Sequence, residues 1–600
     1  MDATSKETAQ QKVEPHSTTE LSDSSRSTTS DGGAPLQRAE TEEVVYPSGP
    51  KTAVIMACLY ISMFLVALDR TILATAIPRI TDEFNSIDDI GWYGSAYLLT
   101  ACGFILIYGR LYTFYPTKWV FLSGIFLFEV GSAICGAAPT STSLIIGRAI
   151  AGFGSSGIFT GAITIMINTV PLHKRPMYQG LFGACFAVAS VAGPLLGGAF
   201  TDSSATWRWC FYINLPLGGA TIVGLVLFLH LNEKDKVHLP WQKQIRQLDP
   251  VGNLFFLPSI ISLLLALQWG GTTYAWNSWR IILLLTVFAV TILCFIAVQV
   301  ITRDTTATIP ARIFLQRSVL AGSLFTFCIG SAFMTGVYYL PLWFQAIKGA
   351  TAVRSGIMSI PLILALVIAA MLCGAMVQRF GYYTPFMYGS VVLASIGAGL
   401  LTTFHEDTNH SKWIGYQVLF GLGIGMGMQQ SNLAVQTVLK HKDVPTGAAL
   451  MFFWQSLGGT IFVSVSQNIF LDKFVKNLAK LPRGTIDPRT LMETGATNIR
   501  KIVKPEDLDA VLIAYNDALM QGPMLVGAII VCLAIFGALG MEWKSTKKNL
   551  PPKGANNRTD VESSAEKDVK TAAATRKTPE PDEREPHNIR EDHNIPNEKL

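Results

Sequence analysis

Long apolar stretches separated by short polar breaks fill most of this 600-residue chain. Many of them exceed the roughly 18 residues that a helix needs to cross a membrane. Half of the residues are hydrophobic and only 15% are charged. The sequence therefore predicts an all-α polytopic membrane protein. The apolar runs predict about fourteen transmembrane helices, near residues 52–77, 92–112, 119–138, 142–170, 177–200, 209–231, 250–269, 279–301, 318–346, 353–378, 384–404, 412–438, 445–470 and 521–541.

The two ends of the chain differ from its apolar middle. They are polar, and such segments bury too little apolar surface to offset the entropy of ordering. No signal-peptide pattern precedes the first apolar run, so the first helix is expected to serve as an uncleaved insertion signal. The predicted organisation is a disordered tail over 1–50, a six-helix bundle over 51–231, a linker with two extra helices over 232–301, a second six-helix bundle with a loop at 471–520 over 302–545, and a disordered tail over 546–600.

Several classes of protein are disfavoured by the composition. The nine cysteines are scattered through the apolar runs, so neither disulfides nor a metal site are indicated. The net charge of +5 is modest and spread along the chain, which argues against nucleic-acid binding. The phosphate-binding loop of an ATP-driven pump is missing, and no catalytic cluster stands out. We therefore expect neither an enzyme nor a cofactor.

Basic residues of the short loops fall mainly on one side if the helices alternate, for instance Lys174, Arg175 and Lys440. Cytoplasmic loops carry an excess of Lys and Arg, so this side is assigned to the cytoplasm. Because the helix count is even, both termini are predicted to be cytoplasmic. The loop over 471–520 then lies outside, where apolar residues at helical spacing predict short amphipathic helices. The sequon at Asn409 also lies outside and is predicted to be glycosylated.

The two halves of the chain contain similar segments. In 148–157 and in 417–425, a Gly-x-Gly begins four residues after a polar residue. Segments 109–118 and 374–381 each close a helix with a similar pattern and lie at nearly the same offset. Two related bundles would explain both repeats. Such repeats are typical of secondary transporters, which alternate access by rocking one bundle against the other.

The segment Gly193-Pro-Leu-Leu-Gly-Gly198 combines small residues with a helix-bending proline. Gly and Ala let two helix backbones approach closely, and Pro194 removes one backbone donor. Two interpretations remain open from this pattern alone. The segment is either a tight static contact or a contact that slides and rocks.

Four segments together resemble motifs of the fourteen-helix drug:proton antiporters of the major facilitator superfamily. Residues 68–78 (Leu-Asp-Arg-Thr-Ile running on to Ala-Ile-Pro) are similar to the helix 1 signature, and residues 147–154 to the helix 4 motif. Residues 193–198 resemble the antiporter motif of helix 5, and residues 207–216 resemble the start of helix 6. The resemblance assigns the antiporter motif to Gly180, Ala189, Gly193, Pro194, Gly197 and Gly198, and a cytoplasmic loop motif to Gly109, Arg110 and Lys118.

This resemblance extends over about residues 50–545 and is strongest to fungal multidrug and toxin exporters. It implies the major facilitator fold, with two six-helix bundles and two inserted helices, and a proton-driven exporter. Two departures stand out. The loop motif has Thr113 and Pro116 in place of the usual acid and second glycine, which leaves its role as a charged latch open. Ala189 replaces one expected glycine of the antiporter motif and preserves close packing.

Three ionisable residues lie within the apolar runs, where each needs a partner or a function. Asp69 and Arg148 lie roughly 12 Å and 9 Å from the outer ends of their helices, at 1.5 Å per residue. If the first and fourth helices pack together, as the resemblance implies, the two side chains can pair. Such a pair is either a static ion pair or a proton-coupling site. Glu129 is either a proton carrier or a protonated acid that fixes packing.

A site for a bulky, mostly apolar molecule should combine aromatic faces with a few amides. Three of the predicted helices offer such residues near the centre of the two-bundle arrangement. Each aromatic is also compatible with a packing or lipid-facing role. The predicted substrate-binding residues are Tyr338, Tyr339, Trp343, Gln345, Gln429, Gln430, Asn432, Trp454 and Gln455.

The sequence and the resemblance together predict proton-coupled export of drugs, toxins or secondary metabolites. The expected partners are a small-molecule substrate, protons and the lipid bilayer, with a monomeric protein in the plasma membrane. The vacuolar membrane is the alternative location. The alternative functions are import of a siderophore or another metabolite, as in a related fourteen-helix family, and sensing of a metabolite without transport.

Overall fold

The computed structural model describes residues 47–547, apart from residues 85, 87–88, 202, 205, 232–239, 272, 304 and 481–502. Nearly all regular structure in this part of the chain is helical. Two isolated β-bridges, Gly270 to Tyr274 and Tyr382 to Ser545, are the exceptions. The tails predicted over 1–50 and 546–600 lie outside the described residues except at their inner ends.

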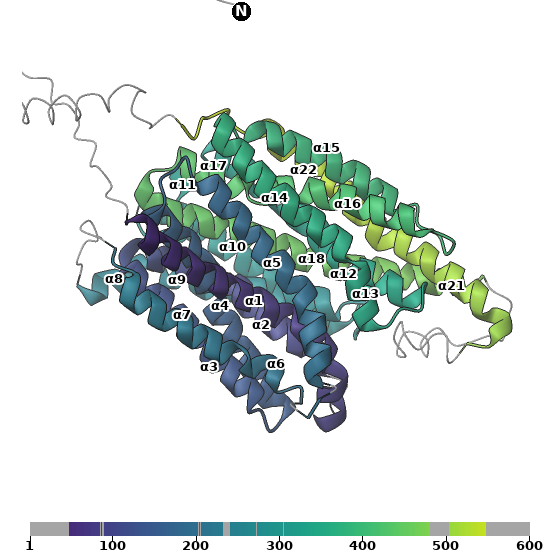
Figure 1. Ribbon diagram of the computed structural model, residues 1–600. Helices are drawn as coiled ribbons and strands as arrows, with labels where there is room; N and C mark the ends of the chain where they lie inside the picture. Colours follow the sequence, from purple (N-terminus) through teal and green to yellow (C-terminus); the bar gives the residue numbers. More distant parts are fainter. Residues whose placement is uncertain are drawn as a thin grey trace, which may run out of the picture. The chain divides into compact units, whose positions relative to one another are not determined.

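The helices follow one another in three sets (Figure 1). The first set is α1 (Gly49–Phe84), α2 (Ile90–Phe114), α3 (Thr117–Gly136), α4 (Ser141–Thr169), α5 (Arg175–Thr201), α6 (Trp209–Tyr212) and α7 (Asn214–Phe228). The second set is α8 (Trp241–Gln247), α9 (Pro250–Trp269), α10 (Trp279–Ile301) and α11 (Ala311–Phe314). The third set is α12 (Arg317–Ala346), α13 (Ala352–Met358), α14 (Ile360–Phe380), α15 (Thr384–Leu401), α16 (His410–Gly427), α17 (Gln430–Val438), the 3₁₀ turn η2 (His441–Asp443), α18 (Val444–Leu478), α21 (Pro505–Leu519), the π-helical η3 (Met520–Met524) and α22 (Leu525–Gly540).

Contacts divide these helices into two bundles. In the first, α3 packs on α4, and α4 packs on α2, while α5 packs on α1. In the second, α16 packs between α14 and α15, and α12 packs on α18 and α22. The inserted helices α9 and α10 pack on each other, and α9 also contacts α2 and α18. The two bundles and the inserted pair confirm the predicted fold class.

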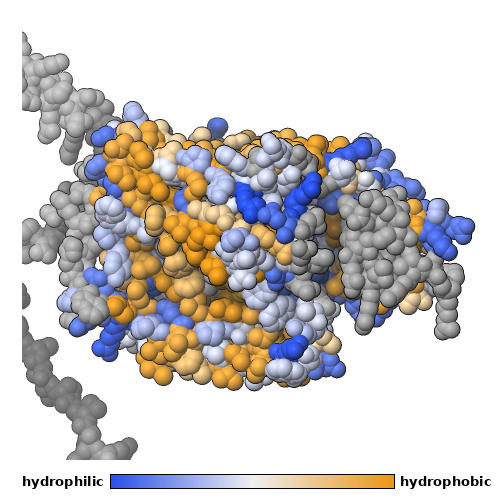
Figure 2. Space-filling model, turned by 90° about the horizontal axis from the view of Figure 1, so that it is seen from below, coloured by the Kyte–Doolittle hydropathy of each residue, from blue (hydrophilic) through white to orange (hydrophobic). Residues whose placement is uncertain are grey.

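Thirteen helical segments of the described residues are long and apolar enough to cross a membrane. Hydrophobic residues also cover much of the face shown in Figure 2. The single helix predicted over 412–438 is wrong, because α16 ends at Gly427 and α17 begins at Gln430. Four glycines at alternate positions in 421–427 weaken the helix before two consecutive glutamines, which explains the break.

The loop predicted over 471–520 is too long. α18 continues to Leu478, and α21 runs from Pro505 through η3 into α22. The predicted amphipathic segment is present as α21, but it packs against α18 and continues into α22 and does not form short separate helices. The ring of Tyr515 lies 5.0 Å from that of Phe470 and 5.1 Å from that of Phe474, between centroids. Residues 481–502 lie outside the described residues.

Glycines explain the repeat between the two halves. A Cβ atom added at Gly154 of α4 would lie 2.4 Å from the backbone nitrogen of Phe128 in α3. The corresponding Gly423 of α16 would bring a Cβ to 2.2 Å from the backbone nitrogen of Ala394 in α15. In both bundles, then, a glycine lets neighbouring helices touch backbone to backbone.

Small residues also bring the two bundles together, along α5 with α14 and along α2 with α18. A Cβ at Gly180 would lie 2.6 Å from the carbonyl oxygen of Ala370, and one at Gly109 would lie 2.6 Å from Ala449 Cβ. The α5 to α14 contact continues from the middle of α14 to Gly374 and Pro176, toward the end of α14 and the start of α5. The second contact involves the end of α2 and the start of α18. Because successive helices alternate in direction, both contacts lie at the same end of the bundles.

We predict that Gly154→Ala and Gly423→Ala each destabilise the fold by about 1–3 kcal/mol, because the new methyl group overlaps backbone atoms. Gly94→Ala and Gly415→Ala are matched controls, since a Cβ at either position meets nothing within 4 Å. Thermal unfolding of the purified variants followed by tryptophan fluorescence measures the difference. Equal melting temperatures for the two classes would contradict the packing argument.

Candidate functional site

A buried ion pair joins α1 to α4. Arg148 Nη1 donates to Asp69 Oδ2 at 2.5 Å, and the side chains are only 2% and 0% exposed. Arg148 Nε also donates to the carbonyl oxygen of Tyr93 at 2.9 Å, and the guanidinium lies 4.4 Å from the centre of the Tyr97 ring. Asp69 Oδ1, in contrast, has no hydrogen-bond partner among the described residues. The carboxylate is therefore only half satisfied.

Local packing explains why these groups meet. Thr140 caps the start of α4 by accepting a hydrogen bond from the backbone nitrogen of Ser143. One turn after Arg148, a Cβ at Gly152 would lie 2.3 Å from the carbonyl oxygen of Tyr97. Only a glycine fits there, so α4 lies directly against α2. This contact holds the guanidinium against the Tyr97 ring and opposite Asp69.

The helix 5 motif contacts α1 two residues beyond Asp69. Thr71 Oγ1 donates to the carbonyl oxygen of Ala189 at 3.0 Å, and a Cβ at Gly193 would lie 2.2 Å from the same hydroxyl. One turn later, a Cβ at Gly197 would lie 2.1 Å from Thr75 Oγ1. This face of the motif therefore fits α5 around two threonines of α1 that follow Asp69.

The remaining motif residues face the second bundle. Gly180, near the start of α5, meets the middle of α14 at Ala370, as described above. Near the other end of α5 the approach is looser. A Cβ atom at Gly198 would lie 3.4 Å from Val353, and one at Gly356 would lie 3.7 Å from Pro194. Both are ordinary van der Waals distances. The motif thus connects the ion-pair helix to the interface between bundles.

The other two charged residues of this region lie apart from the ion pair itself. The Arg70 guanidinium lies 5.3 Å and 5.1 Å from the ring centres of Tyr97 and Phe159. Glu129 is buried between α3 and α7, where a Cβ at Gly218 would overlap its carboxylate. Both Glu129 carboxylate oxygens lack a hydrogen-bond partner among the described residues.

A row of amides follows one face of α17. Gln429, Asn432 and Gln436 are separated by three and four residues, the spacing of one helix face. Gln429 Oε1 and all amide atoms of Asn432 and Gln436 are buried without a hydrogen-bond partner among the described residues. Gln430 Nε2 instead donates to Cys373 Sγ at 3.2 Å and to the Met426 carbonyl at 3.0 Å, while its Oε1 has no partner among the described residues. Gln436 was missed from the sequence, although its spacing from Asn432 would have indicated it.

Most of the predicted residues of α12 are satisfied within the second bundle. Trp343 is fully buried and donates to Asn516 Oδ1 at 2.7 Å, while the Tyr339 hydroxyl donates to the Val463 carbonyl at 3.0 Å. Gln345 Nε2 donates to a serine hydroxyl at 3.1 Å. Because these polar atoms already have partners inside the bundle, the structure does not group them with the α17 amides. Tyr338 is 56% exposed.

The two predicted residues of α18 face α12. The ring of Trp454 lies 6.0 Å from that of Phe327, between centroids, and its indole nitrogen has no hydrogen-bond partner among the described residues. A Cβ at Gly330 would lie 2.7 Å from the carbonyl oxygen of Gln455. Trp454 therefore adds one more unpaired polar atom near the α12 to α18 contact, whereas Gln455 lies at a tight helix crossing.

The residues of the cytoplasmic loop motif do not form the ion pairs expected of a charged latch within the described residues, and contact hydroxyl and carbonyl oxygens. Thr113 Oγ1, which stands where the family usually has an acid, lies 3.3 Å from Thr446 Oγ1 of α18. Arg110 is buried and donates from Nη2 to the carbonyl oxygens of Gln247 at 3.0 Å and Thr306 at 3.4 Å. Both acceptors belong to segments flanking the inserted pair α9 and α10. Lys118 Nζ donates to a carbonyl of α7 at 2.8 Å.

Asp249 fixes the ends of the inserted pair. It is 2% exposed, has a positive φ of 51°, and caps α9 by accepting from the Gly252 nitrogen at 2.8 Å. It also accepts from Gln299 Nε2 at 2.6 Å and from the nitrogen and hydroxyl of Thr308, each at 2.9 Å. Four residues after Thr308, Arg312 forms a bidentate ion pair with Asp443. Its Nη1 and Nη2 atoms donate to Oδ2 and Oδ1, each at 2.6 Å. Polar contacts therefore run from α2 through the inserted pair to the start of α18.

At the opposite end of the first bundle, Trp207 and Arg208 hold the end of α1. Trp207 Nε1 and Arg208 Nη1 donate to Glu83 Oε2 at 2.7 Å and 3.1 Å. Hydrogen bonding from Arg208 lowers the pKa of Glu83 below its usual value, and the Trp207 indole adds to the effect. Asn409 is exposed and caps α16 through its side-chain oxygen, and its glycosylation stays a prediction.

The fold and this site define a multi-pass membrane transporter built from two helix bundles. A family model described as the Major Facilitator Superfamily matches residues 59–463. The chain is 54% identical to the MFS-type efflux pump MFS1 of Arthroderma benhamiae, over 86% of this chain and 96% of that protein. It is 50% identical to the rubrofusarin-specific efflux pump aurT of Gibberella zeae, over 84% of this chain and 92% of that protein.

The chain therefore belongs to the Major Facilitator Superfamily, which confirms the resemblance seen in the sequence, and it is a transporter and not an enzyme. The fold is also similar to that of the proton:xylose symporter XylE, with a TM-score of 0.53 and 12% identity over 83% of this chain and 98% of that one. Within the described residues, no group of three or more His, Cys, Asp or Glu side chains could hold a metal ion.

We predict that Asp249→Asn destabilises the protein by about 1–3 kcal/mol, because one of the two oxygens that now accept hydrogen bonds becomes an NH₂ group, which faces a donor and cannot accept from it. Asp472→Asn is the matched control, since that carboxylate is exposed and pairs with the exposed Lys476. Thermal unfolding in detergent compares the two. If Asp249→Asn unfolds at the temperature of the control, the inserted pair is not held by this carboxylate.

Proposed function

We propose that this protein exports small organic compounds, such as drugs, toxins or secondary metabolites, in exchange for protons by alternating access. The Asp69 to Arg148 pair is the observation that carries the proposal. Intramembrane charges are costly and persist where a function uses them. The relatives named as efflux pumps support the direction of transport. No cofactor is required, because the proton gradient supplies the energy.

The proton would act on the free oxygen of Asp69. Breaking a buried ion pair costs about 3–5 kcal/mol when one charge remains without its partner. Protonation of Asp69 would leave the Arg148 charge with the Tyr93 carbonyl and the rings of Tyr97 and Phe211, none of which carries a negative charge. Arg148 would then favour an arrangement in which it is better solvated. Since Thr71 binds α5 two residues away, a shift of α1 would move the helix that contacts the second bundle.

The substrate would meet the amide row of α17. Unpaired buried amides are costly, and a bound molecule or water offers them partners. The amides carry no charge, so they suit neutral, partly polar compounds. We further propose that the protein works as a monomer in the plasma membrane with both termini in the cytoplasm. The end of the bundles where Gly109 and Gly180 make their contacts would then be the cytoplasmic end.

We predict that Asp69→Asn abolishes the dependence of export on the pH gradient. The amide cannot bind and release a proton, and gradient-driven flux should fall more than about tenfold, as expected for a barrier raised by over 1.4 kcal/mol. The assay uses purified protein in vesicles with an imposed pH gradient and a fluorescent drug. Glu83→Gln is the matched control, because it removes a carboxylate at the half-exposed end of α1.

Two results of this assay would contradict the proposal. Flux by the unmodified protein that ignores the gradient, or full coupling in Asp69→Asn, would remove Asp69 from proton coupling. Absence of flux across a broad panel of compounds would favour a sensor. Gradient-driven movement of a siderophore in the inward direction would favour an importer.

We predict that Asn432→Leu and Gln436→Leu change the relative KM values of a panel of substrates, each by roughly 5- to 30-fold for compounds that hydrogen-bond the amides, or about 1–2 kcal/mol. Gln430→Leu is the matched control, because the neighbouring amide turns toward α14. Transport assays with paired polar and apolar substrates measure the ratios. Identical ratios in all three variants would exclude α17 from substrate recognition.

A further inference from the structure

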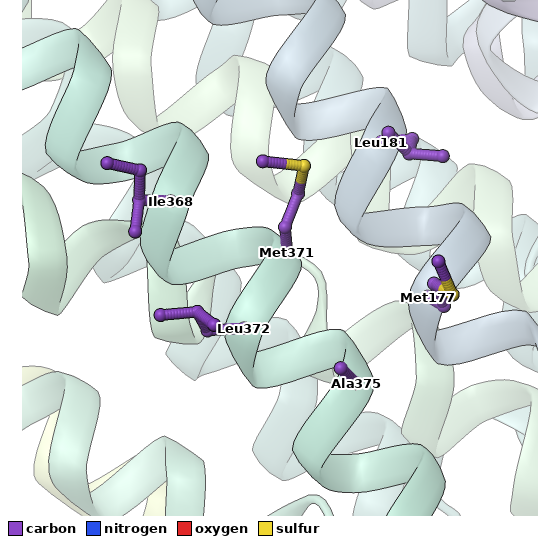
Figure 3. Close-up of a pocket in the computed structure, with 6 residues that line it drawn as sticks. All are labelled: Met177, Leu181, Ile368, Met371, Leu372 and Ala375. Atoms are coloured by element: carbon purple, nitrogen blue, oxygen red, sulfur yellow. The ribbon is translucent and has the colours of Figure 1, made fainter.

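A groove between α5 and α14 is lined only by apolar side chains (Figure 3). It has a volume of about 300 Å³. Several of its side chains are well exposed, including Met177 at 50% and Leu372 at 58%. Both helices are long and apolar enough to cross a membrane, so the exposed apolar lining is suited to contact with lipid acyl chains. The lining residues are Met177, Leu181, Ile368, Met371, Leu372 and Ala375.

The groove lies beside the tightest contact between the two bundles. Gly180 lies between the two lining residues of α5, Met177 and Leu181, and approaches the Ala370 carbonyl of α14. One turn toward the start of α5, a Cβ at Gly374 would lie 2.5 Å from the carbonyl oxygen of Pro176. A molecule in the groove would therefore touch one helix of each bundle where the backbones meet.

Basic residues gather at one end of this groove. Lys174 is exposed and lies three residues before Met177, while the exposed Arg379 lies four residues after Ala375. At 1.5 Å per residue, both are within roughly one helical turn of the apolar lining. Lys547 reaches the same end, since its Nζ donates to the Arg379 carbonyl. Within the part of the chain that the structure describes, no carboxylate forms an ion pair with any of these three residues.

His173 lies at this end of the groove and interacts with two of the basic residues. Its pKa is lowered from its usual value by partial burial and then by the charges of Lys174 and Lys547. Both lysines are thus near the same imidazole although they are far apart in the sequence. The groove therefore combines an apolar channel with basic residues at the helix ends that close it.

We propose that this groove binds one phospholipid with an anionic headgroup. An acyl chain lies along the apolar lining, and the phosphate region is held by Lys174, Arg379 and Lys547. Basic pockets between membrane helices are suited to such headgroups. Because the lipid contacts α5 and α14 together, it stabilises the arrangement in which these two helices touch. This binding does not depend on the transport mechanism proposed above.

The test is a titration of the purified full-length protein with dioleoyl phosphatidylserine or dioleoyl phosphatidylcholine, with bound lipids counted by native mass spectrometry. We expect one tightly retained phosphatidylserine and weaker retention of phosphatidylcholine. The pair Lys174→Gln and Lys547→Gln should weaken phosphatidylserine binding by roughly fivefold for each lost charge. Lys476→Gln is the control, since that exposed lysine pairs with Asp472 on α18.

A second variant tests the apolar part. Leu372→Trp should fill the groove and prevent retention of the lipid, while Leu293→Trp, at a position 65% exposed on α10, should not. Melting curves confirm that each variant is folded. Equal retention of the two lipids, unchanged binding in the charge or groove variants, or full competition by inorganic phosphate alone would overturn the proposal. The proposal would also be overturned if two copies of the chain formed a dimer in the absence of bound lipid.

Discussion

Close contact between helix backbones at glycine is the constraint on which the rest of this structure depends. Helices in a membrane gain little from excluding water, so packing and polar contacts must hold them. Gly152 lets α4 reach the Tyr97 carbonyl, and Gly193 lets α5 reach Thr71. A side chain at either position would push the helices apart. The polar groups of the site, which depend on distances below about 3.2 Å, would then lose their partners.

The Asp69 to Arg148 pair gains its importance from this packing. The guanidinium is held against Tyr93 and Tyr97 of α2, whereas the second oxygen of Asp69 has no partner among the described residues. Such a pair is stable with the charge in place and sensitive to a single proton. Thr71 lies on the same helix and binds the Ala189 carbonyl of α5. The helix that carries Asp69 is therefore hydrogen-bonded directly to α5, the helix that contacts the second bundle.

Some of this arrangement could be predicted from the sequence, and some could not. The depth of Asp69 and Arg148 follows from counting residues along a helix of fixed rise, so their contact was foreseeable once the helix pairing was assumed. The sequence places Trp343 in the substrate site because aromatic faces suit a bulky, mostly apolar molecule. Its actual partner, Asn516, lies 173 residues away, and no local pattern reveals that pairing. The break before α17 was also hidden, because glycines serve both packing and bending.

The inserted helices α9 and α10 are more than an addition to a twelve-helix plan. In this chain a threonine replaces the acid of the loop motif, so Arg110 has no carboxylate there and is satisfied by carbonyls on both flanks of the inserted pair. Asp249 holds those flanks together, and Arg312 continues the connection to Asp443 at the start of α18. Any motion that separates α2 from α18 at this end must therefore break or carry along contacts of the inserted pair. The loss of one acid in the motif thus makes the inserted helices part of the junction between the bundles.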